Sequence, residues 1–407
     1  MKKENKIIGL FLSIFIINYT VRQIICSAIG LNIYYNLMLI IFTIFIIKDK
    51  RFKKEKKKLI IISILLINII FANMINRLSI GYYINPVLNF IIPMIFISID
   101  TIIDSRETFI KIMKIMNLLM YIVTFLGVID YISGYKLNYL LRSIVYNSGL
   151  KELMEIMSSY GTYRLFNALG HPLVNVEYYF IYFFMNWSAS KYLNININMF
   201  KVIIVYIIGI FLCGSKMSLI LSILVIFIYS ARSRNKYLKM SILCFTISIS
   251  IIFVNTTVFK ENIGTRIISA IQSGDFTNGR ISSIKKVIEY SNYRPSILIG
   301  KGYGYSTVIT EELKTNNFEF PPLMMAYDYG IFSTILIYFM SLIDPILHLI
   351  KRKEILLSGA LIILIIYFNS FNGLVYGDSF ARLIFTVKIL YDISKLKNIE
   401  GVIKCEK

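Results

Sequence analysis

Charge is scarce in this 407-residue chain, and acidic residues are the scarcest part of it. Only 16% of the residues are charged, with 23 Asp or Glu against 44 Lys or Arg, which gives a net charge of +21. A soluble protein of this size spreads charge over its whole surface, whereas here the charges gather between long apolar runs. This distribution argues against an ordinary soluble domain.

Cysteine and histidine are also rare, and their placement argues against metal or disulfide chemistry. The two histidines and four cysteines include no CxxC pair. We therefore expect no disulfide framework, no metal and no cofactor. Nor is there a basic stripe on a soluble domain, so we expect no binding of nucleic acid despite the positive charge. The chain also lacks internal repeats and low-complexity tracts.

What the chain has in abundance is apolar sequence. Hydrophobic residues make up 57% of it, and the mean hydropathy is +0.67. A membrane-spanning helix needs about 20 mostly apolar residues. The sequence predicts an all-α polytopic integral membrane protein, a single transmembrane domain over 1–407, with about twelve spans. The candidate spans are 7–25, 30–47, 59–76, 82–99, 112–132, 172–190, 201–214, 217–231, 239–256, 322–349, 355–374 and 380–394.

The short basic loops predict the orientation of these spans. Lys and Arg collect in short cytoplasmic loops of membrane proteins. The N-terminal MKKENK, the run at 48–58, RSRNKYLK at 232–239 and KRK at 351–353 all fall on one side of the predicted topology. Both termini are therefore expected in the cytoplasm, and the first apolar run reads as an uncleaved helix, because no small-residue cleavage site follows it.

Two long loops are then expected outside, at 133–171 and 257–321. Loops of this length are commonly functional. The first contains SGLKELMEIMSSYG (148–161), whose spacing predicts a short amphipathic helix that lies at the membrane surface. The second contains GRISSIKKVIEYSNYRP (279–295), helix-like until its proline, and then the glycine-punctuated ILIGKGYGYS (297–306).

Cationic side chains at this outer side are candidate ligands for phosphate. Arg164 lies in the first loop, Arg266 and Arg280 in the second, and Lys216 in the tight turn GSK between two spans. A guanidinium presents a planar fork of donors that fits phosphate oxygens in pairs. The plainer alternatives are solvated loop charge, contact with lipid headgroups, and a snorkelling lysine at position 216.

His171 and Glu177 open the span at 172–190 and are further candidates. Pro172 suits a first helical turn, and Asn175 shares a helix face with His171. An ionisable group such as Glu177 inside a span is a functional candidate by default. A structural tie between Glu177 and an Arg or Tyr is an equally good reading. Other charges within the predicted spans, such as Asp344 and Lys388, read as structural.

Four motifs in this order resemble the superfamily of O-antigen polymerases and ligases, the Wzy and WaaL types, over roughly 160–345. They are YRLFNALGHPL (163–173), CGSKMS (213–218), the pair NGR (278–280) with RPSILIGKGYGYS (294–306), and EFPPLMMAYDYG (319–330). Two positions depart from the family pattern. Lys216 stands where an arginine is usual, and Glu319 stands where ligases carry a histidine eleven residues before the glycine.

The resemblance implies a Wzy-type repeat-unit polymerase for an O-antigen or capsule. Such an enzyme is a metal-independent glycosyltransferase at the outer face of the bacterial plasma membrane. It transfers a nascent glycan from undecaprenyl pyrophosphate to a lipid-linked repeat unit, beside a flippase and a chain-length regulator. Arg164, Lys216 and Arg280 would hold the pyrophosphate, with Arg266 in reserve, His171 and Glu177 would line the substrate site, and Glu319 would be the general base.

Two alternatives stay open. A ligase of the same superfamily would move a finished glycan to another acceptor, although the exchange at position 319 argues against it. A transporter or flippase of lipid-linked sugars would form no bond. Transporters usually show internal repeats and polar residues near the bilayer midplane, whereas the polar interest here lies at the outer face.

Overall fold

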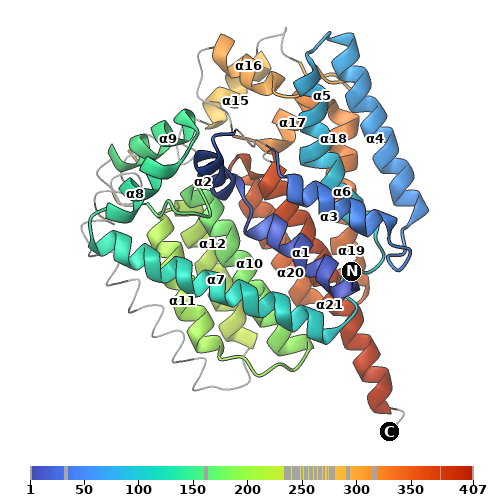
Figure 1. The fold of residues 1–407 in the computed structure, drawn as a ribbon, viewed down its shortest axis with the longest axis vertical. Helices are drawn as coiled ribbons and strands as arrows, with labels where there is room; N and C mark the ends of the chain where they lie inside the picture. The colour runs from blue at the N-terminus through green and yellow to red at the C-terminus, as the bar shows by residue number, and fades with distance from the viewer. Residues whose placement is uncertain are drawn as a thin grey trace.

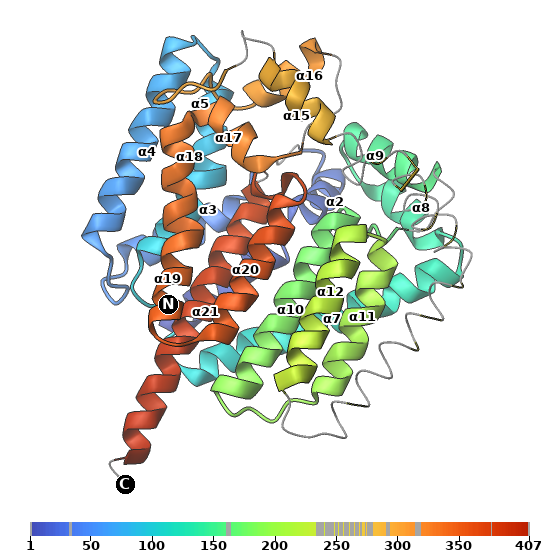
Figure 2. The same cartoon turned by 180° about the vertical axis from the view of Figure 1, so that it is seen from behind.

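Helices make up the secondary structure of the described residues, apart from two isolated β-bridges. The computed structural model describes residues 2–31, 35–159, 164–232, 280–289, 294–313, 319–375 and 377–405, together with isolated positions between 233 and 279. Figure 1 shows the helices gathered into one bundle, and Figure 2 shows its reverse side.

The helices of the first half match most of the predicted apolar runs. They are α1 (Lys3–Phe15), α2 (Tyr19–Ile29), α3 (Leu37–Lys48), α4 (Lys56–Ile75), α5 (Ile80–Pro86), α6 (Ile92–Ile95), α7 (Arg106–Ile132), α8 (Lys136–Ile144), α9 (Ser148–Ser159), α10 (Pro172–Tyr192), α11 (Met199–Cys213) and α12 (Lys216–Arg232). A π-helical turn, η1 (Val87–Ile91), and a 3-10 turn, η2 (Phe96–Ser98), continue α5 and α6 into one rod.

The second half continues the bundle. Its helices are α15 (Arg280–Glu289), α16 (Tyr305–Glu312), α17 (Pro321–Tyr329), α18 (Ile331–Tyr338), α19 (Asp344–Lys351), α20 (Ile355–Asn369) and α21 (Gly377–Cys405), with the short turns η5 (Phe339–Ile343) and η6 (Asn372–Leu374). The predicted span at 239–256 and most of the loop that follows it lie outside the described residues.

The apolar helices indicate a membrane protein. Four stretches of the described chain are long and apolar enough to cross a bilayer: Lys56–Ile75, Ile80–Ser98, Arg106–Ile132 and Ile331–Lys351. The pair α1 and α2 would add a fifth if counted as one bent span, and four shorter apolar helices of 10–17 residues accompany them. The count of about twelve spans and their orientation therefore stay predictions.

The first predicted span, 7–25, is not one straight helix. The axes of α1 and α2 differ by 86° across a break at 16–18. Carbonyl groups freed by such a break need partners in an apolar surrounding. Asn36 donates to the carbonyls of Ser13 and Ile17, and Tyr178 donates to that of Phe15. These carbonyl groups at the break therefore have hydrogen-bond donors.

The predicted span at 322–349 is also wrong in its bounds, because Gly330 divides it. Gly330 has φ of 88°, a positive value that favours glycine, and it separates α17 from α18. A Cβ at this position would lie 2.7 Å from the carbonyl oxygen of Leu298, so the close approach of that loop also requires glycine. The candidate span therefore begins at Ile331, and α17 stands before it as a separate short helix.

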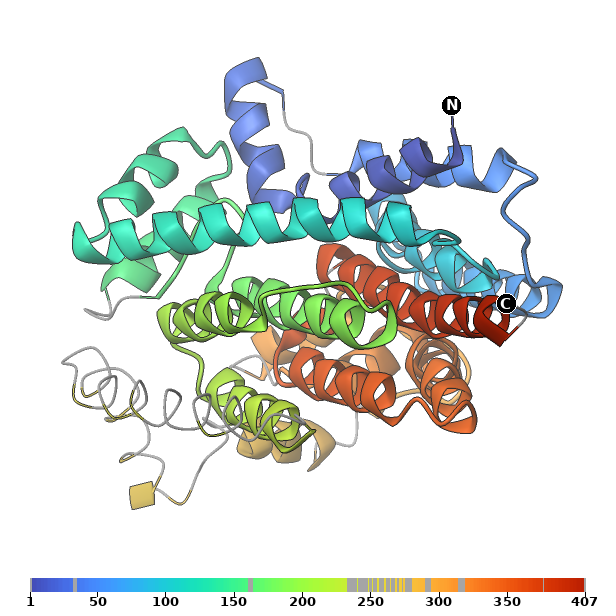
Figure 3. The same ribbon diagram turned by 90° about the horizontal axis from the view of Figure 1, so that it is seen from below.

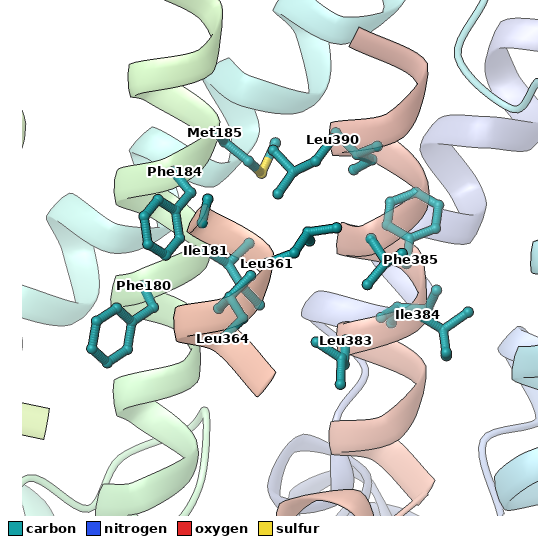
Figure 4. Close-up of a cluster of buried hydrophobic side chains, with 14 of the residues drawn as sticks. Phe180, Ile181, Phe184, Met185, Leu361, Leu364, Leu383, Ile384, Phe385 and Leu390 are labelled. Carbon is teal, nitrogen blue, oxygen red and sulfur yellow. The ribbon is translucent and has the colours of Figure 1, made fainter. Parts of the chain in front are cut away.

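The centre of the bundle is formed by α10, α20 and α21. Most of the side chains of α10 are buried along its whole length. Figure 4 shows buried side chains of α10, α20 and α21 in one cluster, with Ile181 and Met185 of α10 on the side that faces Leu361 and Leu364 of α20. Seen from below in Figure 3, α7 lies across one side of this layer and α18–α19 stand on the other.

The loop end of the bundle is the end at which α10 and α21 begin and α11 and α20 finish. Figure 1 shows α15, α16 and α17 at this end, and the C-terminus projecting from the opposite one. Two charges expected to be structural lie toward the opposite end and are paired there. Asp344 contacts Lys58 at 3.6 Å, and Lys388 contacts Asp392 at 2.9 Å.

Candidate functional site

Arg280 and Glu319, the two predicted catalytic residues, form an ion pair at the loop end. Arg280 is the first residue of α15, and Glu319 precedes α17 by two residues. Arg280 also donates through Nη1 to the carbonyl oxygen of Ser370, at the C-terminus of α20, across 2.7 Å. Both paired side chains are about one-third exposed, so the pair is open to a ligand.

The backbone at Glu319 is held in an unusual conformation. Its φ is 41°, in the left-handed region that residues other than glycine rarely adopt. Such conformations cost free energy and persist where the surrounding structure fixes them, often at ligand-binding positions. Here the following helix begins with two prolines, Pro321 and Pro322, whose rings fix the direction of α17.

Arg164 lies at the same end of the bundle, beside the end of α11. The backbone N–H of Leu165 donates to the carbonyl of Leu212 across 2.8 Å, which fixes the loop against α11. The Arg164 guanidinium interacts electrostatically with His171, Cys213 and Tyr367. Because Lys216 starts α12 three residues after Cys213, the same turn carries the second predicted phosphate ligand.

His171 caps α10 and is neutral at physiological pH. Its Nδ1 accepts a hydrogen bond from the backbone N–H of Leu173 at 3.2 Å. Burial, and secondarily the Arg164 guanidinium, lower the pKa of His171 to about 3. A neutral imidazole with Nδ1 engaged in the cap adds no positive charge to the site, so any substrate contact it makes is a neutral hydrogen bond.

The C-terminus of α20 joins these two groups. Tyr367, which interacts with Arg164, stands one helical turn before Ser370, which accepts from Arg280. The last turn of α20 thus contacts Arg280 directly and interacts electrostatically with Arg164. Arg266 lies outside the described residues, so its place relative to this site is a prediction.

Glu177 is not open to a substrate in this structure. It accepts hydrogen bonds from Arg382 Nε at 2.8 Å and from Ser379 Oγ at 2.6 Å, and it is fully buried. The structural tie is therefore the reading that the contacts support. A buried carboxylate is tolerated when it is paired and hydrogen-bonded, as it is here.

The sequence did not identify Arg382 as the partner of Glu177. It also did not identify a second ion pair, between Arg22 and Asp378. Arg22, on α2, contacts Asp378, on α21, at 3.2 Å and also donates to the carbonyl of Ile17. The signal was present: Arg22 interrupts an apolar run, and GDSFAR (377–382) opens another. The partners could not be found, because 356 residues separate Arg22 from Asp378.

The glycine-rich segment 297–306 also acts differently from a phosphate-binding loop. Its backbone N–H groups at Gly304 and Ser306 donate to the carboxylate of Asp328 at 3.0 and 2.8 Å. Asp328 is 1% exposed, so these amides are engaged inside the protein. Successive N–H groups of such a loop bind anions, and here the bound anion belongs to the chain itself.

Comparison with known proteins adds no relative. No protein-family model matches the chain, and no curated protein or solved structure shows significant similarity to it.

Proposed function

We propose that the chain is a surface polysaccharide polymerase of the Wzy type, with about twelve spans, both termini in the cytoplasm and the loop end facing outside. It transfers a nascent glycan from undecaprenyl pyrophosphate to a lipid-linked repeat unit. The observation that carries the proposal is the ion pair of Arg280 and Glu319 beside the end of α20, a helix end that also interacts electrostatically with Arg164. These residues come from three of the four motifs that resemble the superfamily.

The chemistry needs one base and several fixed cations. A hydroxyl oxygen of the acceptor sugar attacks the anomeric carbon of the donor glycan and forms the new glycosidic bond. The bond between that carbon and the pyrophosphate oxygen breaks, and undecaprenyl pyrophosphate leaves with the bonding electron pair. Glu319 takes the hydroxyl proton. Cations fixed where this negative charge develops stabilise the transition state.

Arg280 can act on both the pyrophosphate and the base, Glu319. A guanidinium has five N–H donors, and the contacts to Ser370 and Glu319 use two of them. Its other donors can bind pyrophosphate oxygens while the Glu319 contact holds the base beside the reacting groups. A pyrophosphate that draws the guanidinium toward itself weakens the ion pair and frees the carboxylate to accept a proton. Arg164 and Lys216 supply further positive charge from the α10 and α12 side of the site.

The test is polymerisation by the purified protein in liposomes, with undecaprenyl-pyrophosphate-linked repeat units as the substrate and a gel ladder as the readout. Loss of a general base or of a positioned cation typically slows such a step by about 10²–10⁴-fold. Glu319→Gln and Arg280→Met should each slow the formation of the ladder to that degree. Chelation of divalent metals should leave the ladder unchanged.

A matched control is available in the first predicted external loop, 133–171. Arg142 and Glu155 form an ion pair of 2.7 Å between α8 and α9, in no motif of the resemblance. Arg142→Met and Glu155→Gln should leave the ladder intact. A full ladder from both site variants would overturn the assignment of Arg280 and Glu319.

The same assay separates the other functions. A ligase would consume preformed long chains, attach them to a different acceptor and make no ladder from single units. A transporter would move the lipid-linked sugar across the liposome membrane without forming a bond. Either result would replace the polymerase proposal.

A further inference from the structure

Asp328 is a buried carboxylate that the proposed chemistry does not use. It lies on α17, before the span that starts at Ile331, and it is 1% exposed. Its carboxylate accepts hydrogen bonds from the backbone N–H groups of Gly304 and Ser306. Gly304 is the N-cap of α16 and Ser306 lies in its first turn. Asp328 therefore caps α16 from a different helix and pins its start to α17.

The backbone around Asp328 adds further ties between the loop and α17. The N–H groups of Lys301 and Gly302 each donate at 2.9 Å, to the carbonyls of Tyr327 and Asp328. At the other side of the break, Ile331 N–H donates to the carbonyl of Ser296 at 3.0 Å. The glycine loop thus lies on α17 as a continuous, hydrogen-bonded strap.

Glycine is required for this approach at position 300. A Cβ there would lie 2.2 Å from the carbonyl oxygen of Asp328, closer than two such atoms can come. Asn68 of α4 and Asn76, the residue that caps the C-terminus of α4, donate to the carbonyls of Leu298 and Gly300 at 2.8 and 3.3 Å. The strap is therefore fixed on both sides, to α17 and to a candidate membrane span.

The strap connects to the site through a small separate core. Val287 of α15, Ile309 of α16 and Met324 and Tyr327 of α17 form a buried cluster of their own. Lys286 of α15 also donates to the carbonyl of Leu313, just after α16, at 3.0 Å. Since Arg280 begins α15 and Glu319 lies two residues before α17, the distance between these two side chains depends on how α15, α16 and α17 are packed.

We propose that Asp328 is a positioning residue that holds Arg280 opposite Glu319 by capping α16 and fixing it to α17. The inference rests on the proposed function for its meaning, but its geometric content is independent of it. Burial of the charged carboxylate costs free energy. It raises the pKa of Asp328 to about 7, although the backbone hydrogen bonds act in the opposite direction. An uncharged side chain would avoid that cost but would cap α16 less strongly.

The geometric test is a cross-link that needs no enzymatic activity. Arg280→Cys and Glu319→Cys are introduced together into a chain whose native cysteines are replaced by serine or alanine. A short bifunctional thiosulfonate then joins the two thiols in liposomes. We expect a high yield with Asp328 present and a yield several-fold lower after Asp328→Asn.

A second cross-link serves as the matched control. Arg142→Cys with Glu155→Cys replaces the ion pair between α8 and α9, away from the strap. Its yield should not change with Asp328→Asn. Gly300→Ala keeps the carboxylate but pushes the strap off α17, so it should lower the first yield and not the second. An unchanged yield between positions 280 and 319 in both variants would overturn the proposal, and a loss of both cross-links together would show general unfolding instead.

The activity assay then separates this inference from the proposed function. Asp328→Asn, with Arg280 and Glu319 intact, should lower kcat for ladder formation and leave KM for the lipid-linked unit nearly unchanged, because an orienting residue acts on the reacting geometry. A lost cross-link without any ladder from the wild type would keep the positioning role and reject the polymerase. A full ladder at wild-type kcat despite a lost cross-link would reject the positioning role alone.

Discussion

Arg382 Nε donates to Glu177 Oε2 across 2.8 Å, joining α21 to α10 with neither side chain exposed by more than 1%. The two residues are 205 positions apart. Ser379, one turn before Arg382, donates to the other carboxylate oxygen and accepts from Arg382 Nη2. The charge pair is thus a buried, hydrogen-bonded polar group between α10 and α21.

Breaking this pair from one side should destabilise the protein strongly. Removing one partner of a buried ion pair leaves an uncompensated charge and costs about 3–5 kcal/mol. We expect Arg382→Met to lower the thermal unfolding midpoint in detergent, and the double variant with Glu177→Gln to recover most of the loss. A double variant that is as unstable as the single one would show that the contact is not the cause.

The exposed pair between Arg142 and Glu155 provides the comparison. Solvent screens such pairs, and they contribute about 0–1 kcal/mol. Arg142→Met should therefore leave the unfolding midpoint nearly unchanged under the same conditions. Equal losses at the buried and exposed pairs would contradict the role given to burial.

The left-handed backbone at Glu319 predicts an unusual order of stabilities. Glu319→Ala and Glu319→Gly both remove the carboxylate that pairs with Arg280, but only glycine adopts φ of 41° without a Cβ penalty. The glycine variant should be more stable than the alanine variant by about 1 kcal/mol, measured by chemical denaturation. In a helix or an extended strand the alanine variant would be the more stable one. That order of stabilities would contradict the left-handed backbone at position 319.

Two glycine-to-alanine changes should have opposite effects. Gly300→Ala places a Cβ against the carbonyl of Asp328 and should cost about 1–3 kcal/mol through the displaced strap. Gly359→Ala, within α20, meets no atom within 4 Å and should stabilise the helix by about 0.5–1 kcal/mol. Thermal unfolding of the two variants beside the wild type decides the matter.

The lowered pKa of His171 predicts acid sensitivity. In the folded chain the imidazole titrates at about 3, whereas the unfolded chain takes up the proton near 6.5. The unfolded state therefore binds more protons between these values, and the free energy of unfolding falls as pH decreases from 6.5 toward 3. Titrating the stability of His171→Gln beside the wild type should show this part of the loss removed.

Asp328 should have the opposite pH dependence. Its folded pKa of about 7 lies above the unfolded value of 3.8, so the folded state holds the proton across that window. The free energy of unfolding contributed by this group therefore rises as pH falls from 7 toward 3.8. The difference in stability between wild type and Asp328→Asn should grow in the wild type's favour over that range, and a flat difference would contradict the burial of a titrating carboxyl.

Much of the helical content could be predicted from local sequence. Apolar runs of sufficient length report helices in a lipid surrounding regardless of what packs against them, and α4, α7, α10 and α20 lie close to their predicted bounds. The breaks were harder to predict. The interruption between α1 and α2 depends on Asn36 and Tyr178 for its stability, and these partners are remote in sequence.

The same contrast between local sequence and contacts of remote residues applies to the candidate site. Residue type singled out Arg280 and Arg164 as cations in long loops of an apolar chain, and the resemblance to the superfamily singled out Glu319 by its distance from Gly330. Only the tertiary structure decided that Arg280 and Glu319 pair, that Glu177 is tied to Arg382, and that the glycine loop binds Asp328. Ion pairs and caps form between whichever groups the packing of helices brings within about 3 Å, and that packing is a property of the whole bundle rather than of any one segment.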